Sequence, residues 1–407
     1  MLRVTNIPRD ATLESLFSAL SCALLPDETD ITIDATIVPS CSTEDQHNTA
    51  LAKYFPRVPK YLEPLSLSCE DIQIETDLGD LTLDKTFYGL TQLYPTAPGE
   101  RIIADIIAVT GLDGHAYGSW RGKGSLARMW LHDFFAKDLP SCRTMTYGYN
   151  TKLRHHSIHT IYDYKLDMLE QIKKARVTSE EKRRPLIFIS HSFGGIVTTQ
   201  ALVKAEEALE NDDDPDAHAI YQATKGLLFF GTPHHGLPTE DILRMIDDKK
   251  HAERADLVRS IGQGSEVLSE ELRKFGYFAE NYKIYSFYER QKTKSIAITD
   301  GNAARSGDYI IPVDTDSAIL NLPGVNETPV PVDGDHSTMV KFDSQTNRIY
   351  RTVLSYIQQL TTSSNGVAEH DIPPTVSQTD SGRNTSKDLI DAINQQHDES
   401  GFSGEIA

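Results

Sequence analysis

The chain has 407 residues, of which 39% are apolar and 24% charged, and its formal net charge at pH 7 is −19. This length is expected to form two domains, one of them large enough to bury a substantial core. The negative charge argues against partners such as nucleic acid or an anionic bilayer. No long apolar run, signal-peptide pattern or CxxC pair occurs, so we expect a reduced, intracellular, cytoplasmic protein.

Residues 1–98 are predicted to form a small α+β domain. Periodicity indicates one helix, Thr12–Leu24, and five strands: Leu2–Ile7, Ile31–Val38, Thr49–Phe55, Ile72–Glu75 and Leu81–Asp84. This order is typical of a ferredoxin-like, or RRM-like, domain. An RNA-binding domain of this class should carry basic residues beside exposed aromatics. The segment instead has six Lys and Arg against fifteen Asp and Glu, so we predict no nucleic-acid binding.

A turn-rich break at Tyr94–Gly99 introduces a second domain, which we place at residues 99–361. Apolar strands alternate there with helices. The strands are Arg101–Val109, Arg143–Tyr147, Pro185–Ile189, Gly226–Phe230, Tyr282–Tyr288 and Pro329–Val332, and the helices are Ser157–Arg176, Gly194–Leu209 and Tyr350–Leu360. This alternation predicts an α/β fold with a doubly wound, mainly parallel sheet.

Two further segments have their own composition. Residues 237–278 are inserted before the fifth of these strands and are helical in composition, so we expect a cap over the site. Residues 362–407 are rich in small polar residues and are expected to form a disordered polar tail.

The strongest chemical signal is the run Leu186–Gly195, in which an apolar strand leads directly to Ser192 and then to a helix. A nucleophile elbow has this context, and its tight turn requires small residues two positions before and after the nucleophile. Ser190 and Gly194 meet that requirement, although G-x-S-x-G has glycine at the first position. We therefore predict Ser192 as the nucleophile.

A serine nucleophile needs an oxyanion hole and a base. We predict the main-chain N–H of Phe193, which follows the nucleophile, and that of Leu112, in a glycine-containing loop after an early strand, as the oxyanion hole. His336, which follows the last predicted strand, is the expected base, with His234 and His235 as weaker rivals. For the acid we favour Glu289, directly after the fifth strand, and Asp314 and Asp316 stay open as alternatives.

These blocks resemble the SERAC-like family of lipase-like serine hydrolases, with its DUF676 and GPI-inositol-deacylase relatives, and in particular the N-terminal hydrolase module of fungal NLR-type proteins. The resemblance spans about residues 80–360 and rests on these runs: Phe87–Thr91, Gly111–His115, Ser119–Trp120, Trp130–Phe134, Met145–Tyr149, Ser190–Gly195, Gly231–Gly236, Ser286–Glu289 and Asp335–Ser337. It implies an α/β-hydrolase fold, a triad of Ser192, His336 and Glu289, lipid ester substrates, and mitochondrial or endoplasmic reticulum membrane association.

The sequence thus predicts a serine hydrolase that cleaves carboxylic esters, of lipid or other acyl groups, through an acyl-enzyme. We expect no cofactor and no metal, and an apolar cap would allow peripheral membrane contact. Members of the family usually have histidine at the position of Thr110 and glycine at the position of Ser190. These departures favour one alternative, a catalytically silent interaction or signalling module. An acyltransferase with the same triad is the other, and the oligomeric state stays open.

Overall fold

The computed structural model describes residues 1–42, 46–67, 71–97, 99–153, 157–208, 214–244, 246, 251–295, 297–299, 302–304 and 307–363. The predicted disordered tail lies outside the described residues from position 364 onward.

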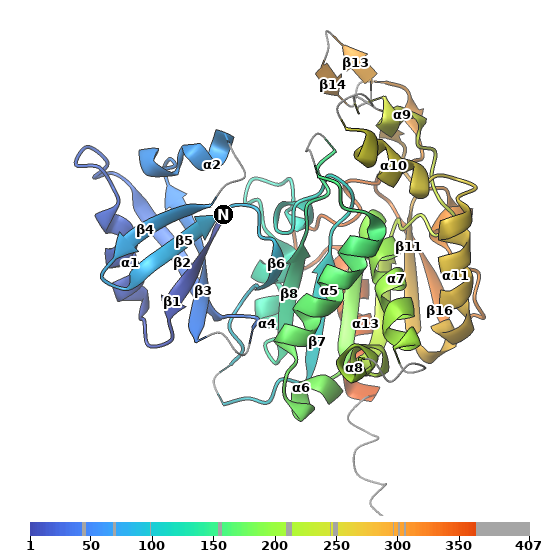
Figure 1. Ribbon diagram of the computed structural model, residues 1–407, viewed down its shortest axis with the longest axis horizontal. Coiled ribbons are helices and arrows are strands. Elements are labelled where there is room, and N and C mark those ends of the chain that lie inside the picture. Colours follow the sequence, from blue (N-terminus) through green and yellow to red (C-terminus); the bar gives the residue numbers. More distant parts are fainter. Residues whose placement is uncertain are drawn as a thin grey trace, which may run out of the picture. The chain divides into compact units, whose positions relative to one another are not determined.

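The first five strands form an antiparallel sheet in the order β2-β3-β1-β5-β4 (Figure 1). They are β1 (Leu2–Pro8), β2 (Thr32–Pro39), β3 (His47–Phe55), β4 (Ile72–Thr76) and β5 (Gly79–Asp84). Helix α1 (Leu13–Cys22) begins with a capping box between Thr12 and Ser15 and buries Leu16 and Leu20 among the residues of this sheet. Two short helices, η1 (Lys60–Leu62) and α2 (Pro64–Leu67), precede β4. The predicted helix and strands occur here, while the ferredoxin-like class stays a prediction.

A seven-stranded sheet follows, in the order β16-β11-β10-β9-β7-β8-β6. Its strands are β6 (Gly89–Gln92), β7 (Ala104–Val109), β8 (Cys142–Gly148), β9 (Leu186–His191), β10 (Thr224–Phe230), β11 (Lys283–Glu289) and β16 (Glu327–Val332). All neighbours are parallel except β6 and β8. The predicted mainly parallel sheet is therefore confirmed, and it begins at Gly89, upstream of the boundary predicted at residue 98.

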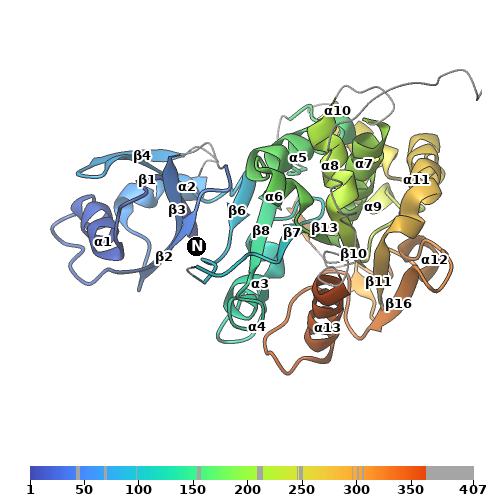
Figure 2. The same ribbon diagram turned by 90° about the horizontal axis from the view of Figure 1, so that it is seen from below.

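Helices cover both faces of this sheet. Figure 2 shows α5 (Ile161–Ala175), α6 (Ser179–Arg183), α7 (Phe193–Glu207), α8 (Pro215–Ala223) and α11 (Glu266–Phe278) on one side, and α3 (Trp130–Asp133), α4 (Phe135–Asp138) and α13 (Arg348–Ser363) on the other. Successive strand residues alternate between two buried clusters: Ile107 and Phe188 belong to one, Ile106 and Ile187 to the other. Burial on both faces explains why these strands are apolar throughout.

The segment predicted as a cap, residues 237–278, has two parts. Helix α11 buries Leu268, Phe275 and Phe278 in the same cluster as α5 and α7, so it covers the sheet rather than the site. The shorter helices α9 (Glu240–Leu243) and α10 (Ala252–Ser260) lie at the upper end of the sheet in Figure 1. Only the part that precedes α11 therefore remains as a candidate cap.

The connection from β11 to β16 contains short elements that the sequence did not predict. Strand β12 (Thr293–Lys294) pairs with β15 (Tyr309–Ile310), and β13 (Ala297–Thr299) pairs with β14 (Asn302–Ala304). Helix α12 (Thr315–Ala318) follows, and two 3-10 turns, η2 (Gly118–Trp120) and η3 (Ala279–Asn281), lie elsewhere. Part of this connection borders the site described below.

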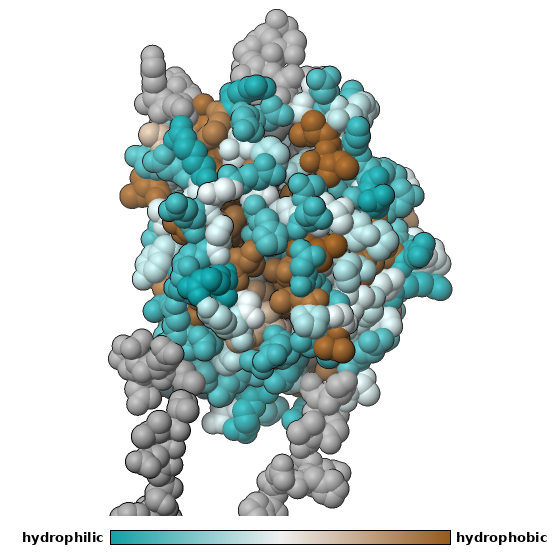
Figure 3. Space-filling model, turned by 90° about the vertical axis from the view of Figure 1, so that its right-hand side faces the viewer, coloured by the Kyte–Doolittle hydropathy of each residue, from teal (hydrophilic) through white to brown (hydrophobic). Residues whose placement is uncertain are grey.

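No described helix combines the length and apolar character needed to cross a bilayer. On the face that Figure 3 shows, apolar residues lie in separate small groups among hydrophilic ones.

A buried ionic cluster joins the starts of β7 and β8 to the end of α5. Arg143 donates to the two Asp105 carboxylate oxygens at 2.8 and 2.9 Å, Arg184 donates at 3.2 Å, and Arg176 completes the cluster. Burial alone would raise the pKa of Asp105, but the charge and hydrogen bonds of Arg143 and the charges of the other two guanidinium groups outweigh it. The pKa of this carboxyl therefore lies below its ordinary value.

We expect Asp105→Asn to lower the free energy of unfolding by about 3–5 kcal/mol, because three buried cations lose their shared anion. A depressed native pKa stabilises the fold above the ordinary carboxyl pKa, and this stabilisation is lost as the pH falls toward the native value. The native protein should therefore lose stability in acid more steeply than the variant. Urea unfolding across that pH range measures both effects. Asp256→Asn, in an exposed pair with Arg259, is the control and should cost less than about 1 kcal/mol; an equal cost for both variants would contradict the prediction.

Candidate active site

Ser192 lies at a sharp turn between β9 and α7. Its backbone has φ 54° and ψ −127°, a left-handed conformation that a non-glycine residue adopts only under strain. The Ser192 N–H donates to the Phe230 carbonyl at 2.8 Å, which ties the turn to the neighbouring strand β10. The geometry matches a nucleophile elbow, which lifts the hydroxyl above the carboxyl edge of the sheet.

The residues around the turn are small because atoms of other loops lie directly against them. A Cβ on Gly194 would clash with the Thr110 carbonyl, and one on Gly195 would clash with Thr232. Ser190, which replaces the usual glycine, is fully buried, and its hydroxyl lies 2.8 Å from that of Thr198. The departure from G-x-S-x-G is thus accommodated, because the extra polar group has a partner.

Three sequence-predicted residues meet at this edge. His336 Nε2 lies 2.9 Å from Ser192 Oγ, and His336 Nδ1 lies 3.2 Å from Glu289 Oε1. A carboxylate can only accept, so Nδ1 carries a proton and Nε2 is left to accept from the serine hydroxyl. Gly231, with φ 53°, allows the imidazole to approach: a Cβ there would lie 3.1 Å from His336 Nδ1. The arrangement can therefore transfer a proton from the serine to the histidine.

The three candidate acids have different positions. Glu289, at the end of β11, is buried, and its Oε1 also accepts from the Val313 N–H at 3.2 Å. Asp314 caps α12 by accepting from the Ser317 N–H at 2.7 Å, and Asp316 is exposed. Of the three, Glu289 is the one hydrogen-bonded to His336.

The rival bases lie apart from this chain of hydrogen bonds. His234 is buried, and desolvation, with a smaller contribution from the His235 charge, lowers its pKa to about 3. Its Nε2 has no hydrogen-bond partner among the described residues. His235 is exposed. The elbow thus meets His336 rather than either of these histidines.

The loop that contains Leu112 lies over the elbow. A Cβ on Gly111 would lie 2.8 Å from Ser192 Cβ, so the main chain of this loop approaches the nucleophile closely. In the described part of the chain, the N–H groups of Leu112 and Phe193 have no hydrogen-bond acceptor. Thr110, the second departure from the family, bonds Ser119 Oγ at 2.7 Å and accepts from Tyr149 OH at 2.7 Å. Two free donors beside a serine hydroxyl are what an oxyanion hole requires.

A cavity of about 530 Å³ opens at Ser192 and His336. Its walls are mainly apolar and come mostly from three segments: the loop that contains Leu112, the candidate cap and the connection after β11. The elbow and single residues of other loops complete them. The lining residues are Leu112, Asp113, Leu153, Ser192, Phe193, Pro233, Leu237, Pro238, Glu240, Asp241, Ile242, Ile261, Ser295, Ile310, Ile311, Pro312 and His336. This volume lies within the range of small-molecule sites. Sequence reasoning missed Ile310–Pro312, because two-residue strand pairs leave no pattern in a sequence.

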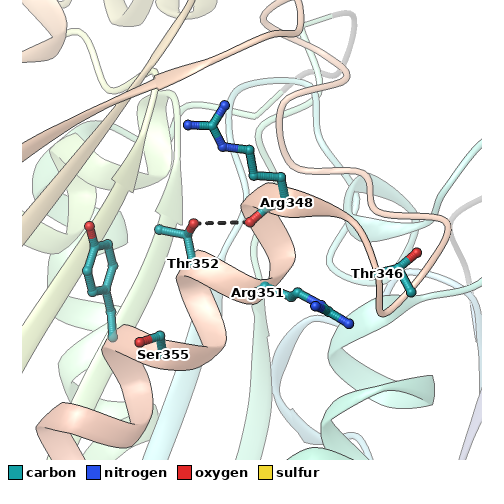
Figure 4. Close-up of a pocket in the computed structure, with 6 residues that line it drawn as sticks. Thr346, Arg348, Arg351, Thr352 and Ser355 are labelled. Carbon is teal, nitrogen blue, oxygen red and sulfur yellow. Dashed lines mark hydrogen bonds between the residues drawn. The ribbon is translucent and has the colours of Figure 1, made fainter.

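A second hollow, of about 500 Å³, lies over α13 (Figure 4). Thr346, Arg348, Arg351, Thr352, Ser355 and Tyr356 line it. Thr352 Oγ1 donates to the Arg348 carbonyl at 3.0 Å, so this hydroxyl is engaged by its own helix. The described residues that line this hollow include no imidazole, carboxylate or thiol, the groups that activate a nucleophile or serve as one. Among the described residues, no group of three His, Cys, Asp or Glu side chains could hold a metal ion.

Comparison with known proteins identifies relatives of one kind. No family model matches the chain. It is 25% identical over 292 residues to protein SERAC1 of Mus musculus and 24% identical over 294 residues to protein SERAC1 of Homo sapiens, covering 66% and 67% of this chain. The chain spans 41% of the length of each of these curated relatives. The predicted SERAC-like resemblance is confirmed, while its DUF676 and fungal NLR-type parts stay predictions.

The solved structures that resemble this chain include proteins named as esterases and lipases. The Bacillus licheniformis lipase BlEst2 has a TM-score of 0.41 and 15% identity, covering 65% of this chain and 97% of the lipase. A putative aryl esterase from Burkholderia cenocepacia has a TM-score of 0.39 and 13% identity, covering 72% of this chain and 100% of the esterase. These likenesses are distant, so a functional conclusion depends on the site itself.

Proposed function

We propose that the chain is a serine esterase in which Ser192 is the nucleophile, His336 the general base and Glu289 the orienting acid. The observation that carries the proposal is the continuous hydrogen-bonded chain from Ser192 Oγ through the His336 imidazole to Glu289, at 2.9 and 3.2 Å. It lies at a strained elbow that opens into an apolar cavity. Reactive hydroxyl, base and acid in this order are the parts of acyl transfer.

In the proposed reaction, Ser192 Oγ attacks the ester carbonyl carbon while His336 Nε2 accepts the hydroxyl proton. The N–H groups of Leu112 and Phe193 stabilise the negative charge on the former carbonyl oxygen. When the tetrahedral intermediate collapses, the carbon–oxygen bond to the alcohol breaks and His336 returns the proton to the leaving alcohol. Water then attacks the carbonyl carbon of the acyl-enzyme while His336 Nε2 accepts one of its protons. The bond from that carbon to Ser192 Oγ breaks, His336 returns the proton to Oγ, and the carboxylic acid leaves.

The alternative of a catalytically silent module rested on Thr110 and Ser190. Both side chains are hydrogen-bonded, and neither separates Ser192 from His336. The site therefore favours an enzyme over a silent scaffold. The ferredoxin-like class of residues 1–98, the location and any membrane contact stay predictions, and the acyltransferase alternative gains no support from a particular residue.

The cavity supports uncharged acyl esters as the substrate class. Leu237, Ile242, Ile261 and Ile311 supply apolar walls, and no lysine or arginine that could pair with an anionic group occurs among the described lining residues. Carboxylates, including Glu240, lie among the lining residues instead. Burial of an aliphatic acyl chain in this cavity would make its binding more favourable. An anionic headgroup would instead be repelled by the negative carboxylates.

A fluorophosphonate probe tests the proposal directly. We expect the folded native protein to acquire a single tag, on the peptide that contains Ser192, as its Oγ bonds phosphorus and fluoride leaves. Ser192→Ala should lose the tag, and Ser295→Ala, which alters another serine in the same cavity, should keep it. Mass spectrometry of the tagged peptides reads the result. Absence of a tag on the folded native protein, or a tag that persists in Ser192→Ala, would contradict the proposal.

Narrowing the cavity should change chain-length preference. Ile242→Trp, in α9, is expected to lower kcat/KM for p-nitrophenyl decanoate by about tenfold and to leave p-nitrophenyl butyrate within about twofold, because the added volume displaces a long chain only. Val325→Trp, at an exposed position outside the cavity, is the control and should change neither. Equal losses for both esters would argue against an acyl chain in this cavity.

A further inference from the structure

His336 stands on a loop, so its position depends on contacts made by its main chain. Its N–H donates to Thr293 Oγ1 at 3.2 Å, and its carbonyl accepts from His191 Nε2 at 2.8 Å. The position of the imidazole therefore depends on these two main-chain hydrogen bonds and on the hydrogen bond between its Nδ1 and Glu289. Loss of either main-chain contact would let the loop shift relative to Ser192.

His191 connects this loop to the nucleophile itself. It is the last residue of β9 and directly precedes Ser192, and β9 lies at the centre of the seven-stranded sheet. The His191 and His336 rings lie 5.0 Å apart, at 40° to one another. One side chain thus links the strand that carries the nucleophile to the main chain of the base.

We infer that His191 is a positioning residue, whose donation to the His336 carbonyl holds the catalytic imidazole within reach of Ser192 Oγ. The inference rests on the proposed esterase function and adds a residue outside the triad. A carbonyl oxygen only accepts, so His191 carries a proton on Nε2, and its neutral form is sufficient.

The surroundings of His191 keep it neutral. Desolvation, followed by the charge of His336, lowers the pKa of His191 to about 3. It therefore remains uncharged when His336 accepts the serine proton and becomes cationic. A neutral neighbour can support the backbone of His336 without repelling the imidazolium.

Replacing His191 by asparagine or by glutamine distinguishes a role in positioning His336 from a role in the stability of the fold. The glutamine amide reaches about as far as Nε2 of histidine, whereas the asparagine amide is one methylene shorter. We expect His191→Asn to lower kcat for p-nitrophenyl butyrate by about ten- to hundredfold with KM within about twofold, because the base is displaced but the cavity is not. His191→Gln should restore kcat to within about threefold of the native value. Melting curves establish that each variant is folded, and His191→Phe, which keeps a ring without the donor, replaces the asparagine variant if that one unfolds.

Equal losses of kcat in the glutamine and asparagine variants would overturn the inference, as would a native kcat in the asparagine variant or a change confined to KM. The proposed function fails separately: in that case the native protein and His336→Ala would be equally inactive and equally unreactive toward a fluorophosphonate. An active native protein with an inactive His336→Ala and an unaffected His191→Asn would remove only the positioning role.

Discussion

Replacing His336 by alanine is expected to lower kcat for ester hydrolysis by about 10⁴- to 10⁶-fold without unfolding the protein. Its Nε2 lies 2.9 Å from Ser192 Oγ and is the only hydrogen-bond partner of that hydroxyl among the described residues. Without the imidazole, the hydroxyl proton has no acceptor and the serine remains a weak nucleophile. Assays with p-nitrophenyl butyrate at high protein concentration measure the residual rate.

His235→Ala is the matched control for this prediction. His235 lies in the loop after β10, next to His234, the other rival base, and its side chain is exposed. Its removal should change kcat by less than about twofold, since surface substitutions rarely disturb a site they do not touch. A kcat for His336→Ala within about tenfold of the native value, or a greater loss in His235→Ala, would show that the base lies elsewhere.

The serine and histidine positions were predictable because each lies at or shortly after the carboxyl end of a strand. Ser192 ends the run Leu186–His191, and His336 comes shortly after β16. The carboxyl ends of parallel strands meet at one edge of a sheet, so residues far apart in the sequence are brought together there. The acid was less certain, because Asp314 and Asp316 also follow β11 and only tertiary contacts determine how close that connection comes to His336.

In the fold, too, elements marked by a local sequence pattern were predictable, whereas elements placed by contacts between distant residues were not. Continuous apolar runs predicted β7, β9 and β10, because strands buried on both faces must be apolar throughout. The short strand β6 joins the large sheet only through its pairing with β8, which lies more than fifty residues away in the chain. The helical period of α11 is the same whether the helix covers the sheet or the cavity. Its place therefore could not be predicted from periodicity.

Glu289 is buried with little to compensate its charge. Its side chain is fully inaccessible, and its Oε2 has no hydrogen-bond partner among the described residues. Its Oε1 accepts from His336 Nδ1 and from the Val313 N–H, both at 3.2 Å. A carboxylate in this setting interacts most favourably with a positive partner. In the proposed mechanism, this site therefore stabilises the imidazolium that forms when Ser192 loses its proton.

We expect Glu289→Gln to lower kcat by about 10³- to 10⁴-fold with little change in stability. An amide at this position can donate to Nδ1, which would place the imidazole proton on Nε2 and leave no acceptor for the Ser192 hydroxyl. Asp314→Asn is the matched control: it preserves a side chain that can cap α12, so kcat should stay within about twofold. Rates with p-nitrophenyl butyrate and melting curves for both variants measure the difference. A larger loss of kcat in Asp314→Asn than in Glu289→Gln would move the acid to the other carboxylate, because of the two carboxylates only the one that holds the imidazole tautomer is expected to produce a loss of this size in a folded protein.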